Sequence, residues 1–113
     1  TYCTADWSLD NPNQAPKDFV KRYTELYGTN PNTAASFWYD AVMIMADALG
    51  RCDEMTRENL YNELFNVGKD QELILNCGSV YCDENRNLDH EVILGQNQDN
   101  VLQVITSLKE SEF

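Results

Sequence analysis

The chain has 113 residues, a length typical of one domain, and 42% of them are hydrophobic, enough for a folded core. Its net charge of −11, with only 8 Lys and Arg residues, argues against nucleic-acid binding, which requires clustered positive charge. The longest apolar run, residues 41–46, is far shorter than the roughly 20 residues needed to span a bilayer. We therefore expect one folded unit with no transmembrane segment.

Two helices are expected in the first half of the chain, after a short extended segment. The spacing of aromatic and aliphatic residues between a proline and a glycine predicts a helix over residues 16–27. A longer and more apolar helix is expected over residues 33–49, capped at Asn32 or Thr33 and ended at Gly50.

This second helix is expected to form the centre of the core. Its apolar residues recur at steps of three and four and extend beyond one stripe, which is typical of a helix covered on most sides. The phase of the stripe predicts that Trp38 and Met45 are largely buried and that Asp47 is exposed.

The pattern changes after a third expected helix at residues 56–67, for which Thr56 is the N-cap. Short runs rich in β-branched residues then alternate with turn-forming residues, which predicts strands. The expected strands are residues 73–75, 80–82, 92–94 and 101–105, and residues 109–113 are expected to fray. The sequence thus predicts three helices followed by a small, mostly antiparallel sheet, in a single α+β domain or fragment spanning residues 1–113.

The four cysteines are Cys3, Cys52, Cys77 and Cys82. An even number in a short acidic chain suits two disulfides in an oxidising compartment. Free thiols, which pack as small hydrophobic side chains, account for them as well. Zinc is disfavoured because the spacing lacks the close pairs typical of zinc ligands.

The order of these features resembles that of a known family. The stretch DFVKRYTELYGTNPNTAASFWYDAVMIMADAL is similar to the C-terminal part of the type 1 periplasmic solute-binding proteins, the substrate-binding proteins of branched-chain amino-acid ABC transporters. The similarity covers nearly the whole chain and rests on short motifs at Phe19, Tyr23, Tyr27-Gly28, Pro31, Ala34-Ala35, Tyr39 to Val42, Ala48-Leu49 and residues 78–85. The sequence departs from the family pattern at Cys82, where Phe is usual, and at Arg86 or Asn87, where Gly is usual.

This resemblance implies an α/β fold of two lobes hinged around a ligand cleft, of which the chain would hold only part. It implies partners as well: a small-molecule ligand, a transporter permease, the missing lobe or another copy of the chain. The implied location is periplasmic or extracellular. Because the chain begins at Thr1 and shows no signal segment, we expect a processed chain or an excerpt.

The candidate ligand contacts lie at the start of the second helix. Ala34, Ala35 and Ser36 fall in its first turn, where unpaired N–H groups and the positive end of the helix dipole suit a carboxylate. The resemblance places this junction near the family's cleft. Tyr39 offers a hydroxyl one turn further on. Ordinary packing of a helix start and of an aromatic side chain is the alternative.

We expect no catalytic residue, cofactor or metal. Asp40 has no paired carboxylate at helical spacing and is interpreted as structural. Residues 83–91 carry oxygen side chains at alternate positions, as a calcium loop does, but Leu88 stands where that loop requires glycine, which favours a polar turn. His90 has no evident nucleophile beside it in sequence, and a cysteine–histidine pair rests only on the presence of both residue types.

Two functions stay open. The first is the solute-binding component of an ABC-type uptake system, which binds a small amino acid or amide without chemistry. The second is a secreted, disulfide-stapled structural or protein-interaction module that keeps the binding-protein scaffold. In the second case the aromatic side chains Tyr2, Trp7 and Tyr61 are expected to be exposed and to contact the partner.

Overall fold

The computed structural model describes residues 1–109 and 112, and these residues form three helices and two three-stranded antiparallel sheets. The three helices and the antiparallel pairing are confirmed, but the strands form two sheets instead of the single expected sheet, because β1, which precedes the helices, pairs with β5. The prediction that residues 109–113 fray falls mainly outside the described residues. The helices are α1 (Gln14–Tyr27), α2 (Thr33–Arg51) and α3 (Arg57–Phe65), and the strands are β1 (Tyr2–Ala5), β2 (Leu73–Leu75), β3 (Gly78–Cys82), β4 (Leu88–Asp89), β5 (Glu91–Gln98) and β6 (Val101–Lys109).

The helix ends are set mostly by the residues that the sequence indicated. The Asn32 side chain accepts a hydrogen bond from the Ala35 N–H, and the Thr56 hydroxyl caps α3 in the same way. Gly28 ends α1 in the left-handed conformation, with φ at 69°. The expected stop at Gly50 is wrong, because α2 continues to Arg51, whose side chain bonds to α3 and holds the last turn in helical form.

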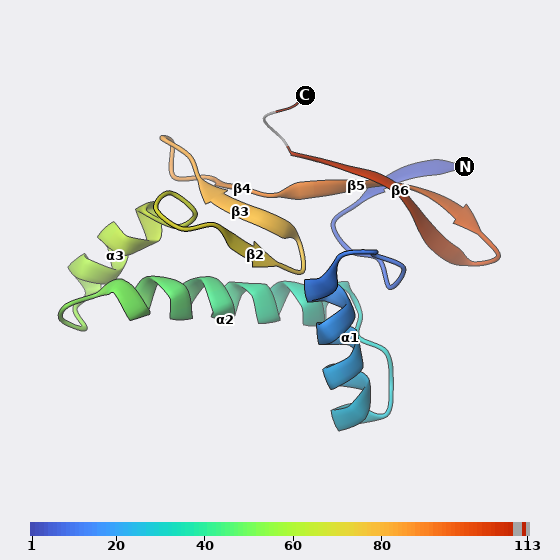
Figure 1. The fold of residues 1–113 in the computed structure, drawn as a ribbon, viewed down its shortest axis with the longest axis horizontal. Coiled ribbons are helices and arrows are strands. Elements are labelled where there is room, and N and C mark those ends of the chain that lie inside the picture. Colours follow the sequence, from blue (N-terminus) through green and yellow to red (C-terminus); the bar gives the residue numbers. More distant parts are fainter. Residues whose placement is uncertain (110–111, 113) are drawn as a thin grey trace.

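The strands form two separate sheets above α2. One sheet has the order β2-β3-β4, and the other has the order β1-β5-β6. Figure 1 shows β2 and β3 over α2, α1 crossing near the start of α2, and the β5–β6 ribbon extending away with β1 beside it. Strand β1 pairs with β5 so that Tyr2 lies opposite Gln96, and the Ser8 hydroxyl donates to the Leu102 carbonyl at 2.6 Å. The N-terminal segment is therefore fixed to the C-terminal hairpin.

The core lies between the helices and the β2-β3-β4 sheet. Its buried members are Val67, Leu75, Val80 and Cys82, with Ile44, Phe65, Leu73 and Cys77 packed against them. A second apolar contact joins the N-terminal segment to α1, where Trp7 meets the edge of Phe19 at 5.8 Å between ring centroids. Trp7 is only 7% exposed, so its expected role as an exposed contact residue is wrong, whereas Tyr2 and Tyr61 are exposed as expected.

The expected burial of α2 is wrong, because the structure covers only one side of this helix. Trp38 is 74% exposed and Met45 is 40% exposed, while the side chain of Asp47 is half-buried beside Arg51. On the side that faces the sheet, the fully buried residues are small or polar, and Ile44 packs against the core while partly buried. Helical spacing defined the apolar face correctly, but it did not determine which side of the helix meets the sheet. The buried residues of α2 are Ser36, Asp40 and Ala48.

Candidate functional site

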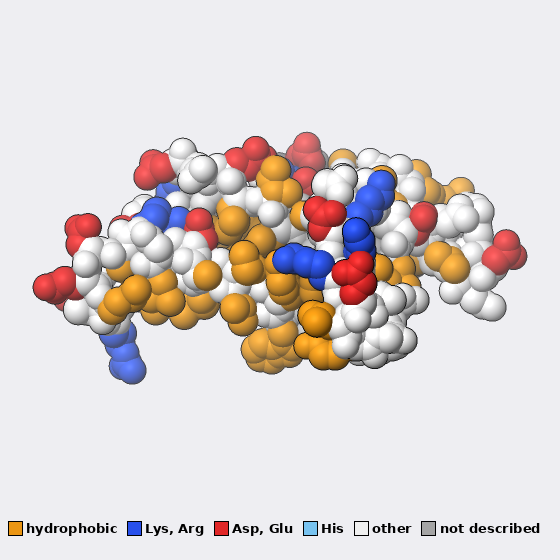
Figure 2. Space-filling model, turned by 60° about the horizontal axis from the view of Figure 1, so that its bottom comes forward, with side chains coloured by type: hydrophobic (Ala, Val, Ile, Leu, Met, Phe, Trp, Pro, Cys, Tyr) orange, Lys and Arg blue, Asp and Glu red, His pale blue; other side chains and the backbone are white. Residues whose placement is uncertain are grey.

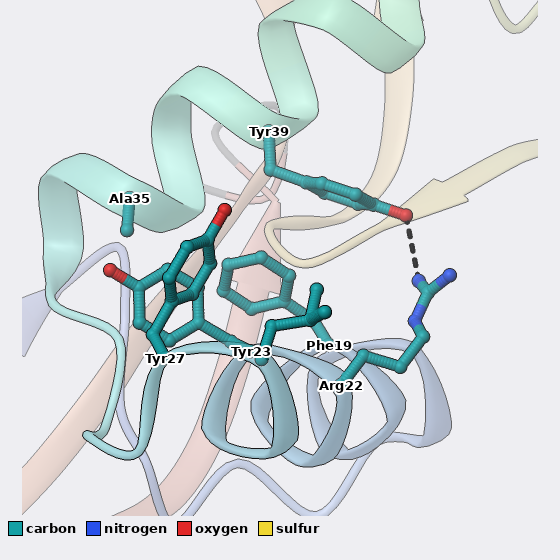
Figure 3. Close-up of a pocket in the computed structure, with 7 residues that line it drawn as sticks. Phe19, Arg22, Tyr23, Tyr27, Ala35 and Tyr39 are labelled. Carbon is teal, nitrogen blue, oxygen red and sulfur yellow. Dashed lines mark hydrogen bonds between the residues drawn. The ribbon is translucent and has the colours of Figure 1, made fainter.

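A pocket of about 330 Å³ lies between α1 and the first half of α2. Its floor comes from α1, where Phe19, Tyr23 and Tyr27 follow each other at steps of four and therefore share one face. Ala35 and Tyr39 project toward them from α2, also four residues apart (Figure 3). The sequence thus builds the pocket from two helical rows that face each other.

The pocket is walled by aromatic rings and has a polar edge. The ring centroids of Phe19 and Tyr39 are 4.9 Å apart, and those of Tyr23 and Tyr27 are 4.6 Å apart. At the edge, the Arg22 guanidinium donates a hydrogen bond of 2.8 Å to the Tyr39 hydroxyl, as the dashed line in Figure 3 marks. Apolar walls with a few convergent polar groups are typical of small-molecule sites.

The charge of Arg22 is available to a ligand. Within the part of the chain that the structure describes, the carboxylate ion pairs involve Arg51 and do not involve Arg22. A guanidinium presents several N–H donors in one plane, so Arg22 can hold Tyr39 and still donate to a carboxylate. The pocket therefore combines apolar walls with one cation in a strongly acidic protein.

Of the four predicted contacts, the structure brings only Ala35 and Tyr39 into this pocket. Ala34 is exposed at the helix start, and Ser36 is buried at 2% exposure on another side of α2. The Ala35 N–H donates to Asn32 Oδ1 at 2.9 Å and the Ser36 N–H to the Asn32 carbonyl at 3.2 Å. Both groups are satisfied within the chain, so the donors left for a ligand in this turn are those of Thr33 and Ala34.

The α1 side of the pocket was missed by sequence reasoning. In the sequence, Phe19, Tyr23 and Tyr27 predict an amphipathic helix and are motif positions of the family resemblance, with no indication of a ligand site. The signal that distinguishes them was present, since three aromatic residues at successive steps of four on a surface helix exceed what one core contact requires. Arg22, next to this row, gave no signal of its own.

A second hollow, of about 340 Å³, lies between α2 and strands β3 and β4, and brings Asp40, Cys77 and His90 to one surface. Asp40 is buried, and its carboxylate accepts the N–H groups of Asn76 at 3.1 Å and Cys77 at 3.0 Å. Its interpretation as a structural residue is confirmed, because it fastens α2 to the turn between β2 and β3.

The ionisation of Cys77 decides whether this hollow suits nucleophilic chemistry. Burial and the neighbouring Asp40 carboxylate raise the pKa of the Cys77 thiol to about 12. Nucleophilic catalysis needs the thiolate at neutral pH, and this site disfavours it. The Nδ1 atom of His90 lies 3.0 Å from the carbonyl oxygen of Glu91. The raised pKa of Cys77 therefore disfavours activation of its thiol beside His90.

The acidic segment after β3 forms a compact polar turn, as expected. Asp83 Oδ1 accepts the N–H groups of Asn85 at 2.8 Å and Asn87 at 2.7 Å, and Arg86 takes a positive φ of 67°. Among the described residues, the structure contains no cluster of His, Cys, Asp and Glu that could hold a metal ion.

All four cysteines are free thiols in the structure, from the exposed Cys3 to the buried Cys82. This result decides the question that the sequence left open, in favour of unpaired cysteines. Within the described ranges, none of the helices is long and apolar enough to cross a membrane.

Comparison with solved structures shows which class of protein this fold is similar to. The chain has the fold of a fragment of the ABC transporter substrate-binding proteins, and it matches solved structures of that class over 92% to 99% of its length. It spans only about 30% of the length of those proteins. No protein-family model matches the sequence, and no curated protein matches it.

Several of the matched structures are named for branched-chain amino-acid transport or leucine binding, and others were solved in complex with benzoate or 3,4-dihydroxybenzoic acid. A putative branched-chain amino acid ABC transporter protein from Rhodospirillum rubrum has a TM-score of 0.80 and 28% identity, over 92% of this chain and 30% of that one. The leucine-binding protein LivK of Thermotoga maritima has a TM-score of 0.78 and 22% identity, over 99% and 31%. A substrate-binding protein of Desulfitobacterium hafniense in complex with Leu has a TM-score of 0.78 and 23% identity, over 92% and 30%.

Proposed function

We propose that this chain is part of the solute-binding component of an ABC-type uptake system, and that it binds a small amino-acid-like carboxylate without chemistry. The observation that carries the proposal is the pocket between α1 and α2, which contains two of the four residues predicted from the sequence. The similar fold of a protein solved with leucine supports the same class of ligand. Like the substrate-binding proteins it resembles, the chain is proposed to act in the periplasm or outside the cell, with a permease as partner.

The ligand is proposed to span the pocket and the start of α2. Its apolar side chain would contact the rings of Tyr23 and Tyr39, and its carboxylate would meet Arg22 or the free N–H groups of Thr33 and Ala34. Ser36 supports the helix start from its buried position. We expect weak binding, because the pocket is open on one side, whereas good sites bury about 70–90% of a ligand.

The proposal that the chain is not an enzyme has its own support. The proteins of similar fold are transport proteins, and the raised pKa of Cys77 disfavours a thiolate in the hollow that Cys77 shares with His90. The competing hypothesis of a disulfide-stapled module has lost its basis, because the four cysteines are unpaired.

A titration of amide chemical shifts with leucine, isoleucine and valine tests the proposal. We expect shifts at residues 33–39 and along one face of α1 at millimolar ligand, with no change in the β5–β6 hairpin. Leucinamide provides the matched control for the carboxylate. A net charge of −11 attracts this cation in general, so a stronger response to leucine can only come from local donors.

Two variants sharpen the result. Arg22→Gln should weaken leucine binding and leave leucinamide unaffected, while Tyr39→Phe removes only the hydroxyl that Arg22 contacts. If none of the three amino acids shifts any residue between 33 and 39, the proposed site is wrong. Equal responses to leucine and leucinamide would remove Arg22 from the proposal but keep the pocket.

A further inference from the structure

The pocket between α1 and α2 treats the two charged groups of an amino acid differently. The described residues that line it are aromatic, aliphatic or basic, and none of them is Asp or Glu. Arg22 supplies the charge of this lining, and it donates to the Tyr39 hydroxyl at 2.8 Å. An amino acid carries a carboxylate and an ammonium group side by side. The lining therefore offers a charged partner to the carboxylate and none to the ammonium group.

The acidic residues nearest to Arg22 along α1 lie outside the pocket. Asp18 and Glu25 stand four residues before and three residues after Arg22, and together with Lys21 they line a separate, exposed hollow. Figure 2 shows Lys, Arg, Asp and Glu side chains grouped next to hydrophobic ones on this side of the molecule. Asp18 also accepts a hydrogen bond of 2.8 Å from the Gln14 side chain. These acids therefore lie beside basic and polar side chains and not among the aromatic walls.

The aromatic rings of the pocket form a wall, not a cage for a cation. Ring faces attract cations, and quaternary ammonium groups bind where several faces surround one centre. The ring centroids of Phe19 and Tyr23 are 5.8 Å apart, and those of Tyr23 and Tyr27 are 4.6 Å apart. These are contact distances between rings, so a cation does not fit between them. The Arg22 guanidinium already lies 5.8 Å from the centre of the Tyr39 ring and would repel a second cation there.

We propose that this pocket selects apolar carboxylates that carry no ammonium group over amino acids of the same shape. The inference rests on the proposed function, since it concerns the ligand class of the same site. When the carboxylate of an amino acid meets Arg22, the ammonium group lies one carbon away, next to the apolar walls. It loses water there without gaining an acidic partner, which opposes binding. A carboxylate without this group keeps the contacts with Arg22 and the walls and avoids that loss.

The total charge of the protein acts against this preference, which makes the prediction specific. The net charge is −11. Its field disfavours an anion relative to an amino acid, which has no net charge at neutral pH. Tighter binding of the anion must therefore come from local contacts in the pocket.

Two matched pairs of ligands test the proposal by titration of amide chemical shifts. Leucine is compared with 4-methylpentanoate, and phenylalanine with 3-phenylpropanoate, so that each pair shares a carbon skeleton and a carboxylate and differs in the ammonium group. The uncharged 4-methylpentanamide is the control for apolar contact alone. We expect shifts at residues 33–39 and on the pocket side of α1. Each anion should bind at least about threefold more tightly than its amino acid, and 4-methylpentanoate more tightly than its amide.

Three variants assign the preference to named groups. Arg22→Gln removes the partner of the carboxylate and should bring the affinity for 4-methylpentanoate within about twofold of that for 4-methylpentanamide. Leu26 lines the pocket and is 76% exposed, so Leu26→Glu adds the missing acid and should abolish the preference within the leucine pair. Thr24→Glu adds the same charge at an exposed position of α1 outside the lining, and it should change both affinities by less than about twofold.

The outcomes separate this inference from the proposed function. If none of the carboxylates shifts residues 33–39, both are wrong. If leucine and phenylalanine bind at least as tightly as their anions, the proposed function stands and this inference is wrong, because an acceptor such as the carbonyl groups at the end of α1 then receives the ammonium group. If 4-methylpentanamide binds as tightly as 4-methylpentanoate, apolar contact alone explains the preference, and the inference is wrong as well.

Discussion

Asp40 offers a direct test of how α2 is joined to the sheet. Its carboxylate is the buried acceptor for two consecutive backbone N–H groups, those of Asn76 and Cys77. The turn between β2 and β3 leaves these N–H groups pointing into the protein, away from water. Replacing Asp40 by alanine removes both acceptors at once, and replacing it by asparagine keeps one oxygen and turns an NH₂ group toward the other donor.

The expected loss of stability follows from these two bonds. A buried donor left without an acceptor costs about 1–3 kcal/mol, so Asp40→Ala exposes the protein to a penalty of about 2–6 kcal/mol. Removal of a buried carboxylate offsets part of this, because burying that group is itself unfavourable. We therefore expect a net loss of about 3 kcal/mol for alanine and about 2 kcal/mol for asparagine.

The pH dependence gives an independent check with a defined sign. Burial raises the pKa of Asp40 above its ordinary value of 3.8, and the hydrogen bonds from Asn76 and Cys77 only partly oppose this. Above pH 3.8 the native state therefore keeps a proton that the unfolded state has released. The stability contributed by this group is complete below pH 3.8 and is lost as the pH rises through the raised pKa.

Urea denaturation of the wild type, Asp40→Asn and Asp40→Ala at several pH values provides the measurement. Because asparagine does not titrate, the stability difference between wild type and Asp40→Asn isolates this group from the other acidic residues. That difference should shrink from about pH 4 toward about pH 7. Asp53→Asn, at an exposed position, is the control and should stay within about 0.5 kcal/mol. A difference that grows with pH, or an alanine variant as stable as the control, would refute the reasoning.

Three further predictions concern stability. Gly28 and Gly68 have nearly equal positive φ values of 69° and 73°, but only at Gly68 would a Cβ meet the backbone of a neighbouring strand. In urea titrations Gly28→Ala should lower the free energy of unfolding by about 1 kcal/mol, and Gly68→Ala should lower it by at least about 2 kcal/mol more. Equal losses would show that the strand beside Gly68 leaves room for a methyl group. In thermal denaturation of residues 1–113, Trp7→Ala should cost about 3–5 kcal/mol because Trp7 is buried, and Trp38→Ala should stay within about 0.5 kcal/mol because Trp38 is exposed. The reverse order would show that burial has been assigned to the wrong tryptophan. Arg51→Ala should cost about 1 kcal/mol, with a smaller loss in 1 M salt (Debye length about 3 Å). Salt screens its two partly exposed ion pairs, with Asp47 in α2 and with Glu63 in α3, so a loss that salt leaves unchanged would argue for packing instead.

The features that sequence predicted well are those fixed by neighbouring residues. Helix starts at Asn32 and Thr56 depend on a side chain that bonds three residues ahead, and this information is local. The end of α1 depends on the left-handed conformation that Gly28 adopts freely. At Gly50 the same rule failed, because Arg51, the last residue of α2, bonds to Glu63 of α3 and α2 continues past the glycine.

The features that the sequence did not predict depend on contacts between elements that are distant in the sequence. Helical spacing defines the stripe through Trp38, but it does not show whether another element covers that stripe, and Trp38 is exposed in the structure. For the site, Ala35 and Tyr39 were found from the helix start, while the wall at Tyr23 and the charge of Arg22 belong to a different helix. Residues of α1 and α2 form the pocket together only through tertiary packing, which the spacing along one helix does not reveal. The assignment of all four predicted ligand contacts remains a prediction.

The pairing of β1 with β5 affects how this chain folds during synthesis as well as how its two ends are joined in the folded state. The Ser8 hydroxyl reaches a carbonyl 94 residues further along the chain, and Tyr2 lies opposite Gln96. During synthesis at about 5–20 residues per second, the first strand has no partner for several seconds, until the C-terminal hairpin leaves the ribosome. Until then its unpaired edge is open to wrong partners. Closure of the β1-β5-β6 sheet must therefore come late, after the helices have formed from contacts close in sequence.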